Sequence, residues 1–94
     1  DGLYVEIAAH ADRLADRVRD ALKKNGFVQP YPTAANQVFA VVSNDALAFL
    51  EEKYVFDRWE TVDEDHTVIR ICTSWATESD AVDRLIESLQ AAAK

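Results

Sequence analysis

The chain of 94 residues has no methionine, one cysteine, two glycines and two prolines. The single cysteine, Cys72, excludes an internal disulfide, and we expect a reducing, cytoplasmic setting. Two glycines cannot build the glycine-rich loop that cradles a nucleotide phosphate. No apolar run approaches the roughly 18 residues that a membrane span needs, and no secretory signal opens the sequence. We therefore expect a protein with no membrane partner.

Basic residues are also scarce, since 10 lysines and arginines face 17 acidic residues and the net charge is −7. Nucleic-acid phosphates need a basic surface, so this balance argues against a nucleic-acid partner. The hydrophobic share of 49% and the charged share of 29% are ordinary for a soluble globular domain. The length fits one small domain that spans residues 1–94.

The start of the chain is unusual. Asp1 is no initiator residue, and apolar residues already run in helical register from Leu3 onward with no clean N-cap before them. We therefore expect this chain to begin inside a helix and to be a piece of a longer protein.

Hydrophobic periodicity predicts six elements in the order α-β-α-β-β-α. Apolar residues three and four apart predict an amphipathic first helix over residues 3–25, which Gly26 ends. The other elements are expected as a strand over 37–43, a helix over 45–53 capped by Asn44, strands over 54–61 and 67–73, and a last helix that Thr77 caps with Asp80 at the third position. The second strand is expected to carry an aromatic-rich core of Val55, Phe56 and Trp59.

The connections between these elements determine the expected topology. An acidic turn over residues 63–66 makes an antiparallel hairpin of the second and third strands, while the helical crossover makes the first and second strands parallel. The spatial order 1-3-2 satisfies both connections. We predict an α+β two-layer sandwich in which helices cover one face of a three-stranded mixed sheet. Since the first strand is apolar on both sides, we expect its other face to be covered as well.

Arg70 is the strongest candidate for a functional side chain. It lies in the middle of an apolar strand, where an unpaired buried charge would be costly. Such a side chain either reaches solvent, pairs with a nearby Asp or Glu, or is held for an anionic partner. Its planar fork of donors matches a carboxylate, so a small acidic ligand is the functional interpretation.

The other reactive residues form no complete catalytic set. His10 and His66 lack a third partner for a metal site. Cys72, two residues from Arg70, is expected to be a buried structural thiol. Ser74 has no histidine at a recognisable triad spacing. The prominent aromatic residues are expected in the core or at a domain interface, namely Tyr31, Tyr54, Trp59 and Trp75.

Four segments together resemble a known family. They are His10-Ala11-Asp12-Arg13-Leu14-Ala15, Tyr31-Pro32-Thr33-Ala34-Ala35-Asn36-Gln37-Val38-Phe39, Phe56-Asp57-Arg58-Trp59, and Val68-Ile69-Arg70-Ile71-Cys72-Thr73-Ser74-Trp75-Ala76-Thr77 with Asp80 and Val82. In order and spacing they are similar to the C-terminal domain of bacterial low-specificity L-threonine aldolases. These are pyridoxal-phosphate enzymes of the aspartate aminotransferase fold group.

The resemblance implies that Arg70 binds the substrate, because the matching arginine in this fold group holds the α-carboxylate of the amino acid. It also implies a parent enzyme that cleaves L-threonine, L-allo-threonine and related β-hydroxy-α-amino acids to glycine and an aldehyde. The cofactor, pyridoxal 5′-phosphate, and its Schiff-base lysine would belong to a large domain upstream, so no catalytic or cofactor-binding residue is assigned to this chain. We expect the isolated chain to be inactive and the full-length protein to be a homo-oligomer.

Two positions depart from the family pattern, since Asp12 stands in place of an asparagine and Asp57 in place of a tyrosine. We expect neither side chain to touch Arg70. Another pyridoxal-phosphate lyase or an aminotransferase of the same fold group would share this domain plan. A different alternative is a free-standing amino-acid-binding or interaction module that dimerises through its sheet.

Overall fold

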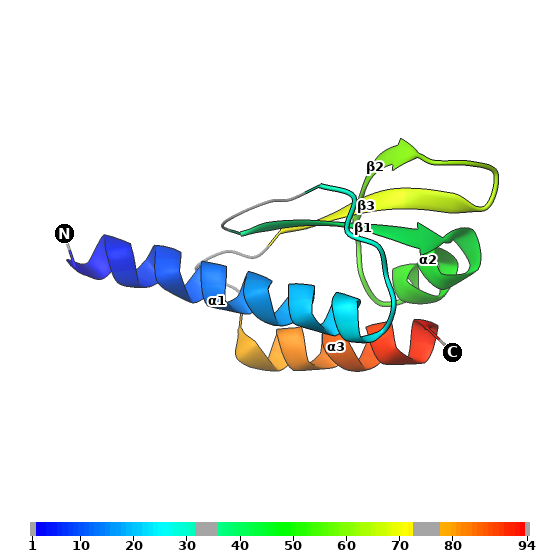
Figure 1. Cartoon of the computed structure of the whole chain (residues 1–94). Coiled ribbons are helices and arrows are strands. Elements are labelled where there is room, and N and C mark those ends of the chain that lie inside the picture. The colour runs from blue at the N-terminus through cyan, green and yellow to red at the C-terminus, as the bar shows by residue number, and fades with distance from the viewer. Residues whose placement is uncertain (1, 32–35, 73–77, 94) are drawn as a thin grey trace.

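The computed structural model describes residues 2–31, 36–72 and 78–93, with side chains from residue 9 onward. Within these residues the predicted element order is confirmed, with bounds α1 Gly2–Lys24, β1 Gln37–Ser43, α2 Asn44–Glu51, β2 Asp57–Thr61, β3 His66–Cys72 and α3 Ser79–Ala92. Helices α1 and α3 lie side by side against one face of the sheet, and α2 sits near one of its ends (Figure 1). The predicted α+β two-layer architecture is therefore confirmed.

The sheet has the predicted order β1-β3-β2, with β3 in the centre. Both β1 and β2 pair with β3 in the antiparallel direction. The first and second strands thus run parallel to each other, as the crossover requires, but β3 separates them. Because no neighbouring pair of these strands is parallel, the sheet is antiparallel, and the prediction of a mixed sheet was wrong on this point.

The side of the sheet that meets α1 and α3 carries the hydrophobic core. Strand residues on this side alternate with residues on the other side, as the pleat requires. The sheet contributes Val38, Ala40, Val42, Ile69 and Ile71, and the helices contribute Leu14, Ala15, Val18, Leu22, Ala46, Leu47, Leu50, Val82, Leu85 and Leu89. At the edge of this core an ion pair between Arg17 and Asp83 joins α1 to α3.

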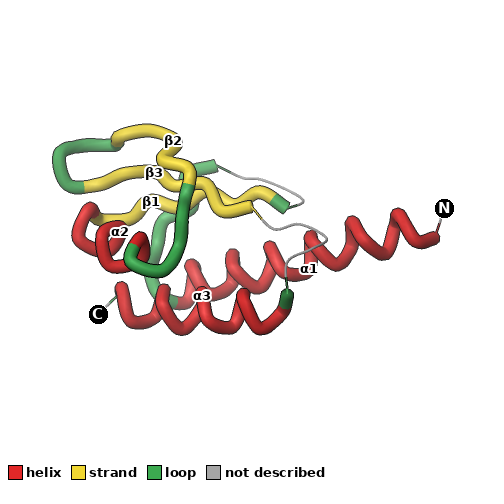
Figure 2. The backbone as a smooth tube through the Cα atoms, turned by 180° about the vertical axis from the view of Figure 1, so that it is seen from behind, coloured by secondary structure: helices red, strands yellow, loops and turns green. Residues whose placement is uncertain are grey.

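Helix α1 ends as the sequence predicts. Gly26 has a φ of 79°, which lies in the left-handed region that glycine adopts without a steric cost. The Phe27 amide donates to the Leu22 carbonyl at 2.9 Å, and the Gly26 amide donates to the Lys23 carbonyl at 3.2 Å. These two bonds satisfy carbonyls at the helix end in the manner of a Schellman turn. At its other end, α1 extends beyond the sheet, so the molecule is elongated, with extents of 47 × 24 × 22 Å (Figure 2).

The cap of α2 differs from the prediction by one residue. The N-cap is Ser43, whose hydroxyl oxygen accepts a hydrogen bond from the Ala46 amide at 3.1 Å. Asn44 is instead the first residue of the helix. Its side chain donates to the Glu64 carbonyl at 2.8 Å and accepts from the Thr67 hydroxyl at 3.0 Å, so it ties α2 to the β2–β3 hairpin. For α3, the predicted cap Thr77 lies outside the described residues, and the structure places Glu78 at the N-cap.

Strand β2 is shorter and more exposed than predicted. It begins at Asp57 rather than at residue 54, and all five of its residues are exposed. Tyr54 and Phe56 pack against the core, whereas Val55 between them is fully exposed and Trp59 is half exposed. The expected core positions of Val55 and Trp59 were wrong, because an extended segment turns alternate side chains away from the core.

Candidate carboxylate-binding site

Arg70 lies on the side of the sheet that faces away from α1 and α3, which we call the outer face. Its neighbours Ile69 and Ile71 point into the core, so the alternation of β3 directs Arg70 to the opposite side. In the strand register Phe39, Arg70 and Asp57 face one another across β1, β3 and β2. Arg70 thus lies at the centre of the sheet but outside the core. Its side chain is 30% exposed.

Asp57 is the direct partner of Arg70. The Nε and Nη2 atoms of Arg70 both donate to Asp57 Oδ2, with a Nε–Oδ2 distance of 2.9 Å. The side chain of Asp57 is 59% exposed, so this is an ion pair in contact with solvent. The hydrogen bond from Asp57 raises the pKa of Arg70 above its ordinary value. The expectation that Asp57 does not touch Arg70 was wrong, because the register of β2 places it directly opposite.

Trp59 covers the guanidinium from the same edge strand. The register of β2 shifts between Arg58 and Glu60, so Trp59 is the extra residue of a β-bulge. Its ring centroid lies 5.1 Å from the guanidinium carbon of Arg70, which is cation–π distance. A planar aromatic ring thereby holds the arginine side chain against the sheet.

Two further aromatic rings extend this surface toward β1. Phe39 contacts the Trp59 ring edge-on, with centroids 5.2 Å apart, and contacts the Tyr31 ring at 5.3 Å. Tyr31 reaches this place because the segment before it bridges to β1, where the Val41 amide donates to the Val28 carbonyl at 2.8 Å. The hydroxyl of Tyr31 also bonds Glu60 of β2.

These residues form a layer of aromatic and charged side chains, in which Asp57 and Trp59 contact the Arg70 guanidinium. Phe39 is buried, while Tyr31 and Trp59 are 38% and 51% exposed. The surface offers stacking faces and one guanidinium, which is paired with Asp57, and a guanidinium suits a small ligand that bears a carboxylate.

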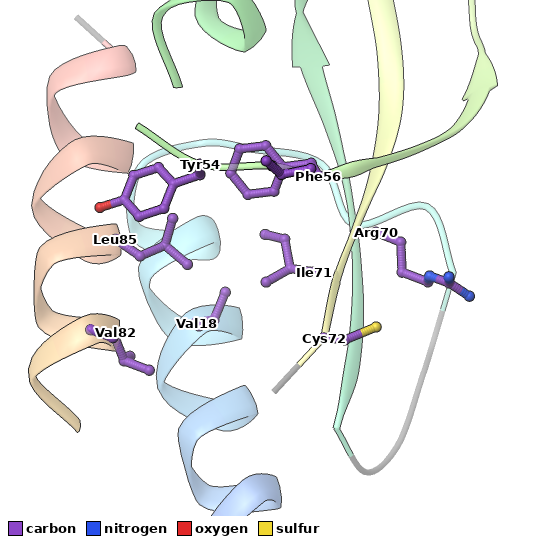
Figure 3. A pocket seen from close by; sticks show the side chains of 10 residues that line it. Val18, Tyr54, Phe56, Arg70, Ile71, Cys72, Val82 and Leu85 are labelled. Atoms are coloured by element: carbon purple, nitrogen blue, oxygen red, sulfur yellow. The ribbon is translucent and has the colours of Figure 1, made fainter. Parts of the chain in front are cut away.

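Cys72 also belongs to the outer face and is exposed. The prediction of a buried thiol was wrong, because the alternation that buries Ile71 turns Cys72 outward at the end of β3. Figure 3 shows Arg70 and Cys72 on one side of β3 and Ile71 on the other.

A separate apolar cavity of about 210 Å³ lies on the helix side of the sheet. Its walls come from α1, α3, β3 and the segment before β2, and include Val18, Tyr54, Phe56, Ile71 and Leu85. Although Arg70 borders this cavity, its guanidinium points away from it (Figure 3). Among the described residues that line this cavity, none other than Arg70 is cationic, and its guanidinium points outward, so we place the candidate site on the outer face.

The other predicted candidates add no ligand group to Arg70. His66 pairs with Asp63 in the β2–β3 turn, and His10 lies on α1. In the described ranges no three His, Cys, Asp or Glu side chains gather closely enough to hold a metal ion. Ser74 and Trp75 lie outside the described residues. No helix in the described part of the chain is both long and apolar enough to cross a membrane.

The sequence identified Arg70 and offered pairing with a nearby Asp or Glu as one alternative, which the structure shows, but it identified neither Asp57 nor Trp59 as the contact. One sequence feature could have pointed to Asp57. It lies two residues before Trp59 on the neighbouring strand, and it is a carboxylate at a position where the family resembled has a tyrosine. The position of Trp59 depends on the bulge, which no sequence pattern here revealed.

No protein-family model matches this sequence, and no curated protein that was searched matches it. Solved structures do. One is the subject of an initial structural analysis of Leishmania major threonine aldolase, with a TM-score of 0.95 and 30% sequence identity, over 100% of this chain and 28% of that one. Another is a Sphingomonas wittichii serine palmitoyltransferase, with a TM-score of 0.70 and 15% identity, over 89% of this chain and 23% of that one.

These likenesses confirm the predicted resemblance to a threonine aldolase along the whole of this chain. The chain has the fold of one part of such an enzyme, and the serine palmitoyltransferase shares that fold alone. It spans about a quarter of the length of either protein, namely 28% and 23%.

Proposed function

We propose that this chain is the small C-terminal domain of a pyridoxal-phosphate-dependent aldehyde-lyase. The parent enzyme cleaves L-threonine, L-allo-threonine and related β-hydroxy-α-amino acids to glycine and an aldehyde. The observation that carries this proposal is the agreement with a threonine aldolase over 100% of the chain at a TM-score of 0.95. The two sequences are also 30% identical, which is more similarity than a shared fold alone requires.

Within this proposal Arg70 binds the substrate carboxylate. The support is its place at the centre of the outer face, with a guanidinium that solvent reaches and a Trp59 ring that fixes its position. A charge-assisted hydrogen bond from a guanidinium to a carboxylate is stronger than a neutral one and orients a planar group. Such an orientation positions the amino acid for cleavage of its Cα–Cβ bond.

Among the described residues, no lysine is placed to bind the cofactor beside Arg70. Lys23 and Lys24 are exposed in the last turn of α1, on the helix side of the sheet, and Lys53 is exposed after α2. None of them lies on the outer face with Arg70. We therefore assign the Schiff-base lysine and the phosphate-binding groups to a large domain outside this chain, and the 94 residues alone are inactive.

The test is the rate at which the full-length protein releases glycine and acetaldehyde from L-threonine. We expect Arg70→Ala to raise KM on the order of 10- to 100-fold, because one charge-assisted interaction is lost. Arg58→Ala is the matched control, since Arg58 lies one strand away, pairs with Glu51 and is 63% exposed. An unchanged KM in Arg70→Ala, or robust cleavage by the isolated chain, would refute the proposal.

A second candidate is a different reaction on the same fold. The likeness to a serine palmitoyltransferase shows that the fold is not confined to aldolases. Another pyridoxal-phosphate lyase or an aminotransferase would use Arg70 in the same way. Product analysis with a panel of amino acids distinguishes them, since only an aldolase releases glycine from threonine.

The assembly of the parent enzyme is part of the same proposal. The exposed rings of Tyr31 and Trp59 on the outer face suit contact with the large domain. We also propose that the full-length protein is a cytoplasmic homo-oligomer. Light scattering of the purified protein measures its mass, and a monomer would refute the assembly.

A further inference from the structure

Asp57 binds one of the two edges of the Arg70 guanidinium that can hold a carboxylate through a pair of N–H groups. The Nε and Nη2 atoms of the guanidinium both donate a hydrogen bond to the same oxygen, Asp57 Oδ2. A bidentate ligand needs two parallel N–H groups, and the edge formed by Nε and Nη2 is one such pair. The domain therefore already contains an internal carboxylate at the place where it is proposed to bind an external one.

The charge of Asp57 opposes the ligand as well. A carboxylate that approaches Arg70 meets a neutral ion pair rather than a free cation. Two carboxylates that share one guanidinium lie only a few ångströms apart and repel each other. The ion pair must therefore open, or its geometry must change, before the guanidinium binds a second carboxylate with its full strength.

The position of the Arg70–Asp57 ion pair allows its two side chains to separate. Asp57 is 59% exposed and lies at the first residue of the edge strand β2. Exposed ion pairs contribute little net stability, so their separation costs little. The contact of Arg70 with the Trp59 ring involves other atoms than its hydrogen bonds to Asp57. Loss of the Asp57 contact thus frees the guanidinium without releasing it from the sheet.

From this geometry we infer that Asp57 is a specificity-determining residue that competes with the substrate carboxylate for Arg70. The inference rests on the proposed function of Arg70 and goes beyond it, because it assigns a role to a residue that departs from the family pattern. Asp57 lowers the affinity of the site for every carboxylate. It acts most strongly against ligands with a second negative group close to the first, because those meet a second repulsion.

The test is steady-state kinetics of the full-length enzyme with L-threonine, comparing Asp57→Asn with wild type. Removal of one repulsive charge at this range is expected to lower KM about threefold to tenfold and to leave kcat unchanged. Asp57→Glu, which keeps the charge, should leave KM close to wild type. Glu51→Gln is the matched control, since Glu51 pairs with Arg58 rather than with Arg70 and should change neither constant.

The outcomes separate this inference from the proposed function. A lower KM in Asp57→Asn with kcat unchanged supports competition. A higher KM would show that Asp57 positions Arg70 for the substrate, and an unchanged KM would show that it has no part in binding. Either of these overturns the inference. If Arg70→Ala in the same assay leaves KM unchanged, it is the proposed function that fails, whatever Asp57→Asn does.

Inhibition by dicarboxylates provides an independent readout. We expect Asp57→Asn to lower the inhibition constant of succinate by a larger factor than that of acetate. Equal factors for the two anions would refute the part of the inference that concerns a second negative group.

Discussion

On the face of the sheet that meets α1 and α3, Ile69 and Ile71 are buried among helix residues, while on the outer face of the same strand Arg70 and Cys72 reach solvent. The inner face gathers aliphatic side chains from all six elements except β2. The outer face gathers rings and charges from the segment around Tyr31 and from β1, β2 and β3. One strand thus contributes one set of alternate residues to the core and presents the other set, with the proposed carboxylate-binding Arg70, on the outer face.

The sharpest way to break the inner face is Ile69→Ala. Ile69 has no exposed surface and lies at the centre of the central strand. Truncation removes buried methyl groups and leaves a cavity, so we expect a loss of about 2–5 kcal/mol in the free energy of unfolding, measured by urea denaturation. Val55→Ala is the control, because Val55 is fully exposed and should change stability by less than about 0.5 kcal/mol.

A smaller stability effect is expected from Phe39→Leu on the outer face. The substitution keeps an apolar side chain but removes the edge-on contacts with Tyr31 and Trp59. We expect a loss of about 1–2 kcal/mol in the same unfolding experiment. A loss as large as that of Ile69→Ala would mean that the outer face is a second core, and the contrast between the faces would disappear.

Arg70→Gln should change stability less than either of these substitutions. It removes an exposed ion pair with Asp57 and a contact with Trp59, both of which solvent already weakens. Its unfolding midpoint is expected close to wild type, while the KM of the full-length enzyme rises. A variant that unfolds as readily as Ile69→Ala would instead assign Arg70 a structural role.

The smallest effect concerns the turn that joins β2 to β3. Asp63 accepts hydrogen bonds from the His66 ring at 3.0 Å and from the Asp65 amide at 2.8 Å. The bond from His66, followed by that from the amide, lowers the pKa of Asp63 below the ordinary value of about 3.9. A lowered carboxyl pKa stabilises the fold above the unfolded pKa, and that stability is lost as the pH falls through the folded pKa.

We therefore expect Asp63→Asn to unfold at a lower temperature than wild type near neutral pH, with a difference that shrinks below about pH 4. Thermal melts at several pH values measure this difference. Asp65→Asn is the control, since Asp65 contributes its backbone amide and carbonyl rather than its carboxylate to the turn. A difference that grows toward acid pH would contradict the assignment.

The sequence predicted the framework well where pattern and connection rules act together. The apolar run from residue 37 to 43 matched β1 at both ends, and the hairpin with the crossover was enough to predict the strand order. Gly26 ended α1 as expected, because glycine adopts the left-handed conformation of this turn without a steric cost. These features depend on local chemistry or on topology.

The outer face was less predictable because it depends on register. Asp57 meets Arg70 only through the pairing of β2 with β3, and the bulge at Trp59 shifts that pairing by one residue. The apolar character of a residue such as Val55 also does not show whether its side chain faces the core or the solvent. Position in the chain therefore identified the arginine, while only the structure identified its carboxylate partner and its aromatic ring.

The most direct test of this account is a crystal structure of the full-length protein with glycine bound. We predict that the glycine carboxylate lies within about 3 Å of the Arg70 guanidinium, that the Trp59 ring still covers that group, and that Asp57 no longer accepts from Nε. A glycine carboxylate bound elsewhere, with the Arg70–Asp57 pair intact, would contradict the account.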